Sequence, residues 1–213
     1  MKTRLKLLLA IGFVCIAAFS SKGQTPADVL KHGSAVTFFG VDFSKCKGVA
    51  LGATAEVMRD NYFPAINTLL MVEQNKYNIS KFLLKSDVTN TLYDVNKWNA
   101  TLDVAGFTVY SIKEVKPLSD DILAEMVQRY DLKDKTGTGL VFIAESLDKP
   151  GNVGTYHLVY FSMPEGKVIL SEKVAGRPQG FGLRNYWAYS IYDILKSGLQ
   201  DRLELIYLSK KTK

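Results

Sequence analysis

Cysteine, histidine and proline are scarce in this sequence. Its 213 residues contain two cysteines, two histidines and six prolines. Cys15 lies near the amino terminus, so Cys46 is the only cysteine after residue 23. One cysteine forms no intramolecular disulfide, and two histidines with one cysteine are too few for a common zinc site. The sequence therefore predicts a domain that its own core stabilises, with no metal and no cofactor.

Long hydrophobic runs are also lacking, except for one near the start. Three positive charges in Met1–Lys6 precede the apolar or small residues Leu7–Phe19. This order is typical of a secretory signal peptide, and we place the cleavage after Gly23. A membrane anchor would need about 20 apolar residues. A lipoprotein acylated at Cys15 is the other alternative, but the bulky Val14 precedes that cysteine.

An excess of charge is missing once residues 1–23 are set aside. Four of the 27 basic residues and none of the 21 acidic residues lie in that segment, which leaves a net charge of +2. Nucleic-acid binding requires a basic surface that neutralises phosphates, so we expect no nucleic-acid partner. The remaining length fits one domain. We expect a signal peptide over 1–23, a single α/β domain over 24–213, and no membrane span after the signal is removed.

Hydrophobic periodicity predicts the elements of this domain. Apolar residues on both faces of Ser34–Phe43 indicate a central strand covered on two sides. Trp187 begins a stripe at helical spacing, which predicts that its indole lies in the core. The expected helices are Asn61–Tyr77 (starting as early as Ala53), Ile79–Leu84, Leu92–Trp98, a helix capped by Ser119, and Leu183–Gly198. The other expected strands are Gly106–Val115, Leu140–Ala144, Tyr156–Met163 and Lys167–Val174.

The resulting order, β-α-(α)-β-α-β-β-β-α, predicts an α/β fold of the α+β-like kind. Helices pack on a mixed sheet that ends in an antiparallel meander. The order resembles the small α/β amino-terminal domain of the Tol–Pal translocation protein. The stretch Gly180–Ala188 is similar to a segment of uncharacterised exported bacterial proteins. These resemblances imply a cell-envelope location and no particular activity.

The segment Gly176–Asn185 is the sharpest candidate for a ligand site. Its glycines allow a ligand to approach the backbone, and it leads into a helix whose amino terminus favours an anion. Its two arginines suit a carboxylate or phosphate. The alternative is a strand-to-helix turn with two solvated arginines, since the dinucleotide-binding pattern is incomplete. The candidate ligand-binding residues are Arg177, Gly180, Gly182, Arg184 and Asn185.

Three weaker candidates remain open. Cys46 paired with His32 or His157 has the composition of a thiolate nucleophile, but a lone cysteine is commonly a small buried hydrophobe. Asp42, Ser44 and Lys45 follow the first strand, where α/β sheets bind ligands, although such residues also satisfy turn amides. The tyrosines of the last helix, Tyr186, Tyr189 and Tyr192, form either a contact surface or part of the core.

Without a catalytic motif, the sequence favours a non-enzymatic secreted or cell-envelope protein that acts through protein–protein contacts. Its expected partner is another secreted or envelope protein, in the periplasm, outside the cell or at the outer membrane. The alternative is a ligand-binding protein or hydrolase that uses the Gly176–Asn185 loop as an anion site.

Overall fold

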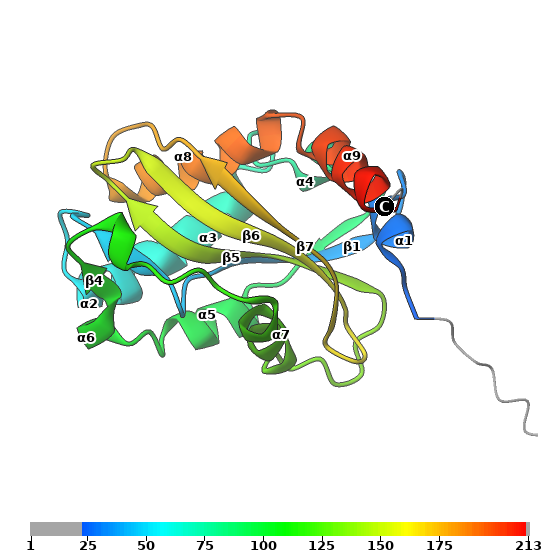
Figure 1. Cartoon of the computed structure of the whole chain (residues 1–213), viewed down its shortest axis with the longest axis horizontal. Helices are drawn as coiled ribbons and strands as arrows, with labels where there is room; N and C mark the ends of the chain where they lie inside the picture. Colours follow the sequence, from blue (N-terminus) through cyan, green and yellow to red (C-terminus); the bar gives the residue numbers. More distant parts are fainter. Residues whose placement is uncertain (1–22, 212–213) are drawn as a thin grey trace, which may run out of the picture.

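A computed structural model describes residues 23–211, and it is organised around one curled, seven-stranded sheet (Figure 1). Along one path the strands follow the order β3-β1-β5-β2-β4, while β6 pairs with β5 and β7 pairs with β6. The predicted signal peptide lies almost wholly outside the described residues. The strands are β1 (Val36–Asp42), β2 (Lys47–Val49), β3 (Val88–Asn90), β4 (Thr108–Val109), β5 (Thr138–Asp148), β6 (Val153–Ser162) and β7 (Lys167–Gly176).

Both parallel and antiparallel pairs occur in the sheet. β1 pairs parallel with β3 and β5, and β2 pairs parallel with β4 and β5. β6 pairs antiparallel with β5 and β7. The predicted mixed α/β class is confirmed. The predicted antiparallel meander is limited to β5, β6 and β7 at the end of the strand order. It does not describe the sheet as a whole, because four of the six strand pairs are parallel.

β1 and β2 lie one after the other along the same edge of β5. Asp42, the last residue of β1, pairs with Ile143, whereas Lys47, the first residue of β2, pairs with Ser146. The connection between them contains Ser44 and Cys46. This connection therefore lies beside the middle of β5, at the carboxyl end of β1.

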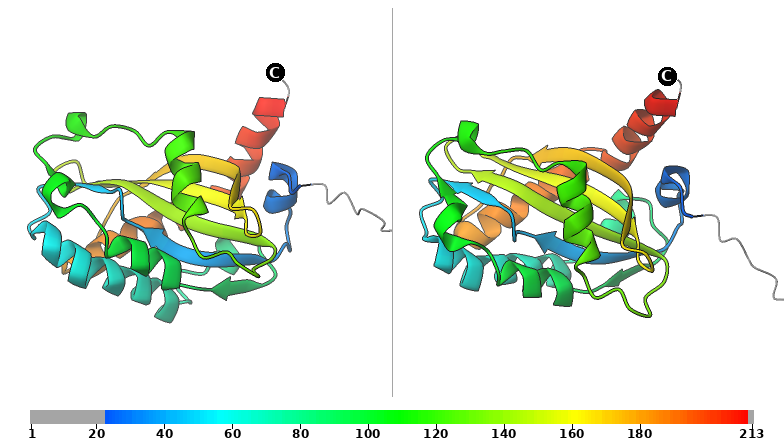
Figure 2. Two further views of the ribbon diagram at one scale, coloured as in Figure 1. Left: turned by 90° about the horizontal axis from the view of Figure 1, so that it is seen from below. Right: turned by 60° about the horizontal axis from the view of Figure 1, so that its bottom comes forward.

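Helices cover both faces of the sheet (Figure 2). The long helices α3 and α8 pack on one face, and α7 packs on the other. The α-helices are α1 (Pro26–Leu30), α2 (Ala55–Val57), α3 (Phe63–Val72), α4 (Ile79–Phe82), α5 (Tyr93–Asn99), α6 (Val104–Phe107), α7 (Asp120–Gln128), α8 (Leu183–Lys196) and α9 (Leu199–Lys211). Two irregular turns complete the set, a π-helical turn over Met58–Tyr62 and a 3-10 turn over Ile112–Glu114.

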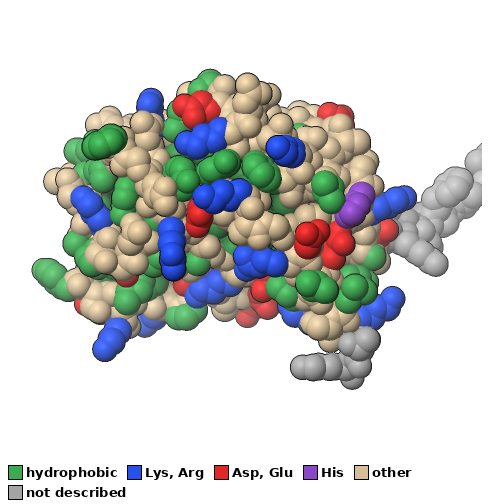
Figure 3. Space-filling model, turned by 90° about the horizontal axis from the view of Figure 1, so that it is seen from above, with side chains coloured by type: hydrophobic (Ala, Val, Ile, Leu, Met, Phe, Trp, Pro, Cys, Tyr) green, Lys and Arg blue, Asp and Glu red, His purple; other side chains and the backbone are tan. Residues whose placement is uncertain are grey.

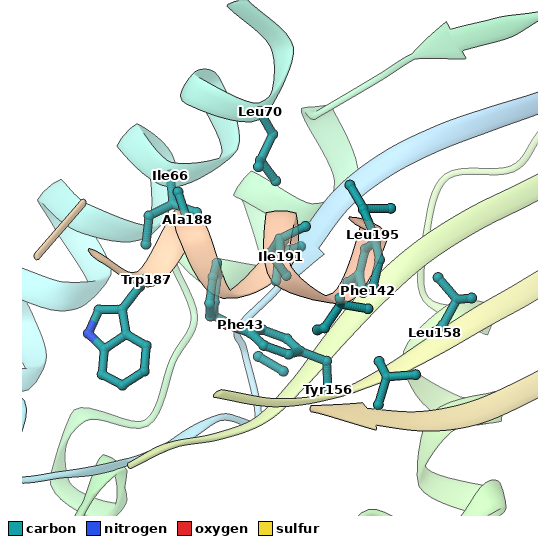
Figure 4. Packing of buried hydrophobic residues seen from close by; sticks show 14 of the residues in the cluster. Phe43, Ile66, Leu70, Phe142, Tyr156, Leu158, Trp187, Ala188, Ile191 and Leu195 are labelled. Atoms are coloured by element: carbon teal, nitrogen blue, oxygen red, sulfur yellow. The ribbon is translucent and has the colours of Figure 1, made fainter. Parts of the chain in front are cut away.

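Residues of β1 and β5 enter two separate hydrophobic cores, so β1 is covered on both faces as predicted. Phe38 belongs to the larger core, beneath α3 and α8, and Phe39 belongs to the smaller core, beneath α7. Trp187 is fully buried in the larger core, which confirms the prediction for its indole. Figure 4 shows side chains of α3 and α8 meeting those of the sheet, among them Ile66, Leu70, Phe142, Tyr156, Trp187, Ile191 and Leu195.

Two buried asparagines satisfy the backbone of β1 beyond its pairing with β3, which ends at Phe38. Asn67 accepts a hydrogen bond from the Val41 amide and donates one to the Val41 carbonyl. Asn99 also donates to the Val41 carbonyl and accepts from the Phe43 amide. Since unpaired buried backbone groups are costly, these side chains take the place of a neighbouring strand.

The predicted strand Gly106–Val115 is wrong. The chain forms α6, only two strand residues in β4, and then the 3-10 turn Ile112–Glu114. The Ser111 side chain accepts from the Lys113 amide at 3.3 Å and so favours a turn over continued pairing. Alternation of apolar and polar residues does not by itself make a strand, because a strand also needs a partner to pair with. β4 pairs only along the short strand β2.

The predicted helix over Asn61–Tyr77 starts before Asn61, ends before Tyr77 and contains a π-helical turn. It runs from Ala55 to Val72, with the π-helical turn immediately before α3. Pro64 lies in the first turn of α3 and has no amide hydrogen. The widened turn, in which the Phe63 amide bonds to the Met58 carbonyl, accommodates this missing donor.

Both ends of the described chain are helical. The segment before β1 contains α1, which Thr25 and Asp28 close with a capping box. The last element of the described residues is the thirteen-residue helix α9. Gln200 of α9 donates to the Leu30 carbonyl of α1 at 2.8 Å. None of the helices described over residues 23–211 is long and apolar enough to span a membrane.

Candidate functional sites

The predicted loop Gly176–Asn185 connects β7 to α8. Gly180 and Gly182 have φ of 112° and 74°, which favours glycine at both positions. The Arg177 amide donates to Asp193 Oδ2 at 2.9 Å, and Arg184 Nε donates to Asn185 Oδ1 at 3.1 Å. The structure therefore brings an acidic residue, Asp193, to the loop, which the sequence analysis did not identify.

Phe181 is a large apolar residue that this loop exposes. Its side chain is 96% exposed, and the flanking Arg177 and Arg184 are also exposed. Tyr110, 95% exposed, follows β4. In both Figure 1 and Figure 2 the β7–α8 loop and β4 lie at the same end of the molecule. Two large aromatic side chains thus face solvent at one end of the sheet.

Cys46 does not have the surroundings of a catalytic thiolate. Its side chain is buried, and the burial raises the pKa of the thiol strongly above its ordinary value. His32 interacts with Glu204, and His157 interacts with Glu145. No hydrogen bond joins either histidine to Cys46 within residues 23–211.

The tyrosines of α8 are half-buried. They are therefore neither a fully exposed contact surface nor fully part of the core. Tyr186 donates to Asn152 Oδ1 at 2.7 Å. The Lys196 ammonium lies 5.1 Å from the centre of the Tyr189 ring and 5.2 Å from that of Tyr192. On the side of the molecule where α8 and α9 lie, basic side chains are interspersed with hydrophobic and acidic ones (Figure 3).

A pocket of about 550 Å³, here called the α7 pocket, lies between the β1–β2 connection and α7. Ser44 lies in its lining and is itself buried. Its apolar lining residues are Cys46, Leu102, Val109, Pro117, Leu118 and Ile122. Its charged lining residues are Lys45, Lys47, Asp103, Glu114, Lys116 and Glu125. This position, at the carboxyl end of a parallel strand, is where α/β sheets commonly bind ligands.

Asp42 holds one wall of the α7 pocket. It is fully buried and accepts hydrogen bonds from the Ser44 amide at 2.9 Å and the Ser44 hydroxyl at 2.5 Å. Arg129 and the Tyr130 hydroxyl donate to its other oxygen at 3.1 and 2.8 Å. Arg129 also donates to the Ser44 hydroxyl, and its guanidinium lies 4.5 Å from the ring centre of Trp98. Of the three residues predicted after the first strand, Asp42 and Ser44 therefore belong to this hydrogen-bond network, whereas Lys45 lines the pocket.

Glu145 holds the opposite wall. It accepts from the Leu118 amide at 3.0 Å, from His157 at 2.9 Å and from Lys173 at 2.6 Å. Burial alone would raise the pKa of Glu145, but these three donors stabilise the carboxylate more strongly and lower its pKa to about 2. Glu145 is therefore ionised at neutral pH and binds the chain immediately before α7.

A third buried carboxylate lies beyond the other end of α7. Asp94 of α5 accepts from the Asp131 amide at 2.7 Å and from Lys135 at 3.1 Å. Glu145, Asp42 and Asp94 thus bind the chain before and after α7. Burying charge is costly and rarely the cheapest way to stabilise a fold. What these carboxylates do provide is a fixed position for α7 and for two walls of the pocket.

Sequence reasoning missed Arg129, Glu145 and Lys173. Glu145 was detectable, because it directly follows the apolar run Leu140–Ala144 and so had to lie at a buried position. Arg129 and Lys173 carried no such signal, because lysine and arginine at helix ends and edge strands are normally solvated.

The comparisons with known proteins identify no relative. No protein-family model and no curated protein matches the sequence. Within residues 23–211, no cluster of three or more histidine, cysteine or acidic side chains is arranged to hold a metal ion.

Proposed function

We propose that residues 1–23 direct export and are removed, and that residues 24–213 act outside the cytoplasm as a non-enzymatic protein-binding domain. The basic start and the short apolar run carry the export proposal. The exposure of Phe181 at the tip of the Gly176–Asn185 loop carries the binding proposal. The proposed partner is another secreted or cell-envelope protein.

The chemistry of the loop suits a protein contact. Aromatic and arginine side chains dominate the binding energy of protein interfaces, and here Phe181 lies between Arg177 and Arg184. Neither arginine forms an ion pair within residues 23–211. The proposed partner surface is therefore an apolar pocket that accepts the Phe181 ring, with carboxylates beside it for the two arginines.

Site-specific photo-crosslinking in the native cell tests this proposal. A photoreactive phenylalanine in place of Phe181 is expected to form one discrete adduct, which is lost when Arg177 and Arg184 are both changed to alanine. Val72 on α3, 69% exposed, is the matched control position and should form no adduct of the same mass. An absent adduct at position 181, or the same adducts at both positions, contradicts a contact through this loop.

An anion-binding role for the same loop is the alternative, as a ligand-binding protein or hydrolase. It is favoured by the amino terminus of α8, where Gly182 provides no side-chain hydrogen bond to the helix. The Asp193 carboxylate beside the Arg177 amide weighs against it. A melting temperature that rises saturably with millimolar phosphate in the wild type, and not in the Arg177→Ala/Arg184→Ala variant, would favour the anion site.

Export is tested separately, by the intact mass of the protein recovered from its own cells. Cleavage after Gly23, within a few residues, is the expected result. Retention of Met1–Gly23 contradicts the signal peptide, and a diacylglycerol on Cys15 would indicate a lipoprotein instead.

A further inference from the structure

The α7 pocket is a second candidate site, separate from the Gly176–Asn185 loop. We propose that it binds a peptide segment of a protein partner, in which an apolar side chain is flanked by charges of both signs. The proposal rests on the shape and lining of the pocket, on the charges around it and on the way its walls are held.

The interior of the pocket suits an apolar side chain. Cys46 and Leu102 are buried, and Leu118 and Ile122 are half-buried on the α7 side. A volume of about 550 Å³ falls within the usual range for ligand pockets, roughly 300 to 1,000 Å³. The pocket is therefore large enough for one or two apolar side chains together with part of their backbone.

The charges around the pocket indicate which ligand it fits. Lys45, Glu114, Lys116 and Glu125 are exposed, and none of them forms an ion pair within residues 23–211. A ligand with one charge, such as a fatty acid, would leave the lysines or the glutamates without a counterpart. A peptide that carries a basic and an acidic side chain complements both kinds.

The buried carboxylates give the pocket a fixed shape. Asp42 and Arg129 hold Ser44 on one side, and Glu145 holds the Leu118 amide on the other. A preformed site loses less entropy when it binds a flexible peptide. This accounts for buried charge on either side of the α7 pocket, where an apolar core would have stabilised the fold at least as well.

The test titrates the isotope-labelled protein with three blocked tetrapeptides and follows the backbone amides by NMR. The peptides share a central Phe-Leu pair, flanked by one lysine and one glutamate, by two glutamates or by two lysines. We expect the mixed-charge peptide to shift the amides of Ser44–Lys47 and Leu118–Ile122 saturably, and to bind several-fold more tightly than the other two. Amides of the Gly176–Asn185 loop should not move, so this result is independent of the protein contact proposed for that loop.

Charge reversal around the pocket supplies the decisive comparison. The Glu114→Lys/Glu125→Lys variant should prefer the acidic peptide, with a change in the ratio of affinities of about tenfold. Asp201→Lys on α9 is the matched control and should leave the preference unchanged, because Asp201 is exposed but does not line the pocket. All of these positions are exposed, and unchanged amide spectra away from the pocket verify folding.

Three results would overturn the proposal. In the first, no peptide shifts the pocket amides. In the second, the reversed variant keeps the wild-type preference. In the third, decanoate shifts the pocket amides and the mixed-charge peptide does not, which would identify a site for an amphiphilic anion.

Discussion

Removing the charge of Glu145 should weaken the attachment of α7 to the sheet. In Glu145→Gln, an amide NH2 group, which donates hydrogen bonds, replaces one of the two carboxylate oxygens. If it replaces Oε1 it faces the Lys173 ammonium, and if it replaces Oε2 it faces the Leu118 amide and His157. In either orientation a donor faces a donor, so the substitution cannot preserve the network.

The expected loss of unfolding free energy is about 3 kcal/mol at neutral pH. Breaking a buried ion pair typically costs about 3–5 kcal/mol. The Lys173 side chain is 49% exposed and can turn towards water, which places the loss at the lower end of that range. Glu125→Gln is the matched control, because Glu125 is exposed on α7, and it should change stability by less than about 0.5 kcal/mol.

The loss should depend on pH in a defined direction. The pKa of Glu145 is lowered from 4.5 to about 2 in the folded protein, so its carboxylate stabilises the fold most above the unfolded value. That contribution disappears as the pH falls from about 5 towards 2, and the wild type and the variant should then converge. Urea unfolding at about pH 7 and about pH 3 measures both effects. A difference below about 1 kcal/mol at neutral pH, or an equal difference at both pH values, would refute the reasoning.

The other predictions concern the core, the loop and the thiol. Trp187→Ala should cost about 3–5 kcal/mol in urea unfolding, because it removes a fully buried indole; a loss below about 1 kcal/mol contradicts its place in the core. Arg177→Ala and Arg184→Ala should each change stability by less than about 0.5 kcal/mol, because both side chains are exposed; a larger loss would mean that the loop supports the fold. Reductant should leave the melting temperature of a chain spanning residues 24–213 unchanged, since Cys46 is the one cysteine in that segment and has no second cysteine to pair with; a shift of several degrees contradicts this.

Local sequence patterns determined much of the scaffold. Continuous apolar residues marked β5 as a strand buried on both faces, because only a covered strand keeps such residues from water. Helical spacing identified the stripe of Trp187, Ile191, Ile194 and Leu195, and all four are buried. Ser119 caps α7 as predicted, with its hydroxyl accepting from the Ile122 amide at 3.3 Å. These features depend on neighbours within a few residues of one another, so the sequence alone reveals them.

Short elements and sites escaped prediction because their partners lie far apart in the chain. β4 exists only where it pairs with β2, about 60 residues earlier, and its alternation was misread as a long strand. The sequence marked Asp42 and Ser44 as the end of a strand, but Arg129 and Tyr130 reach them only because α7 crosses that face of the sheet.

The two candidate sites also differ in how much of each the sequence alone reveals. The glycines of the Gly176–Asn185 loop were visible in the sequence because positive φ favours that residue type. The α7 pocket, by contrast, takes its walls from three separate segments, around Ser44, Asp103 and Leu118. A charge pattern that surrounds a cavity is a property of the folded chain, and only the tertiary structure could bring those lysines and glutamates together.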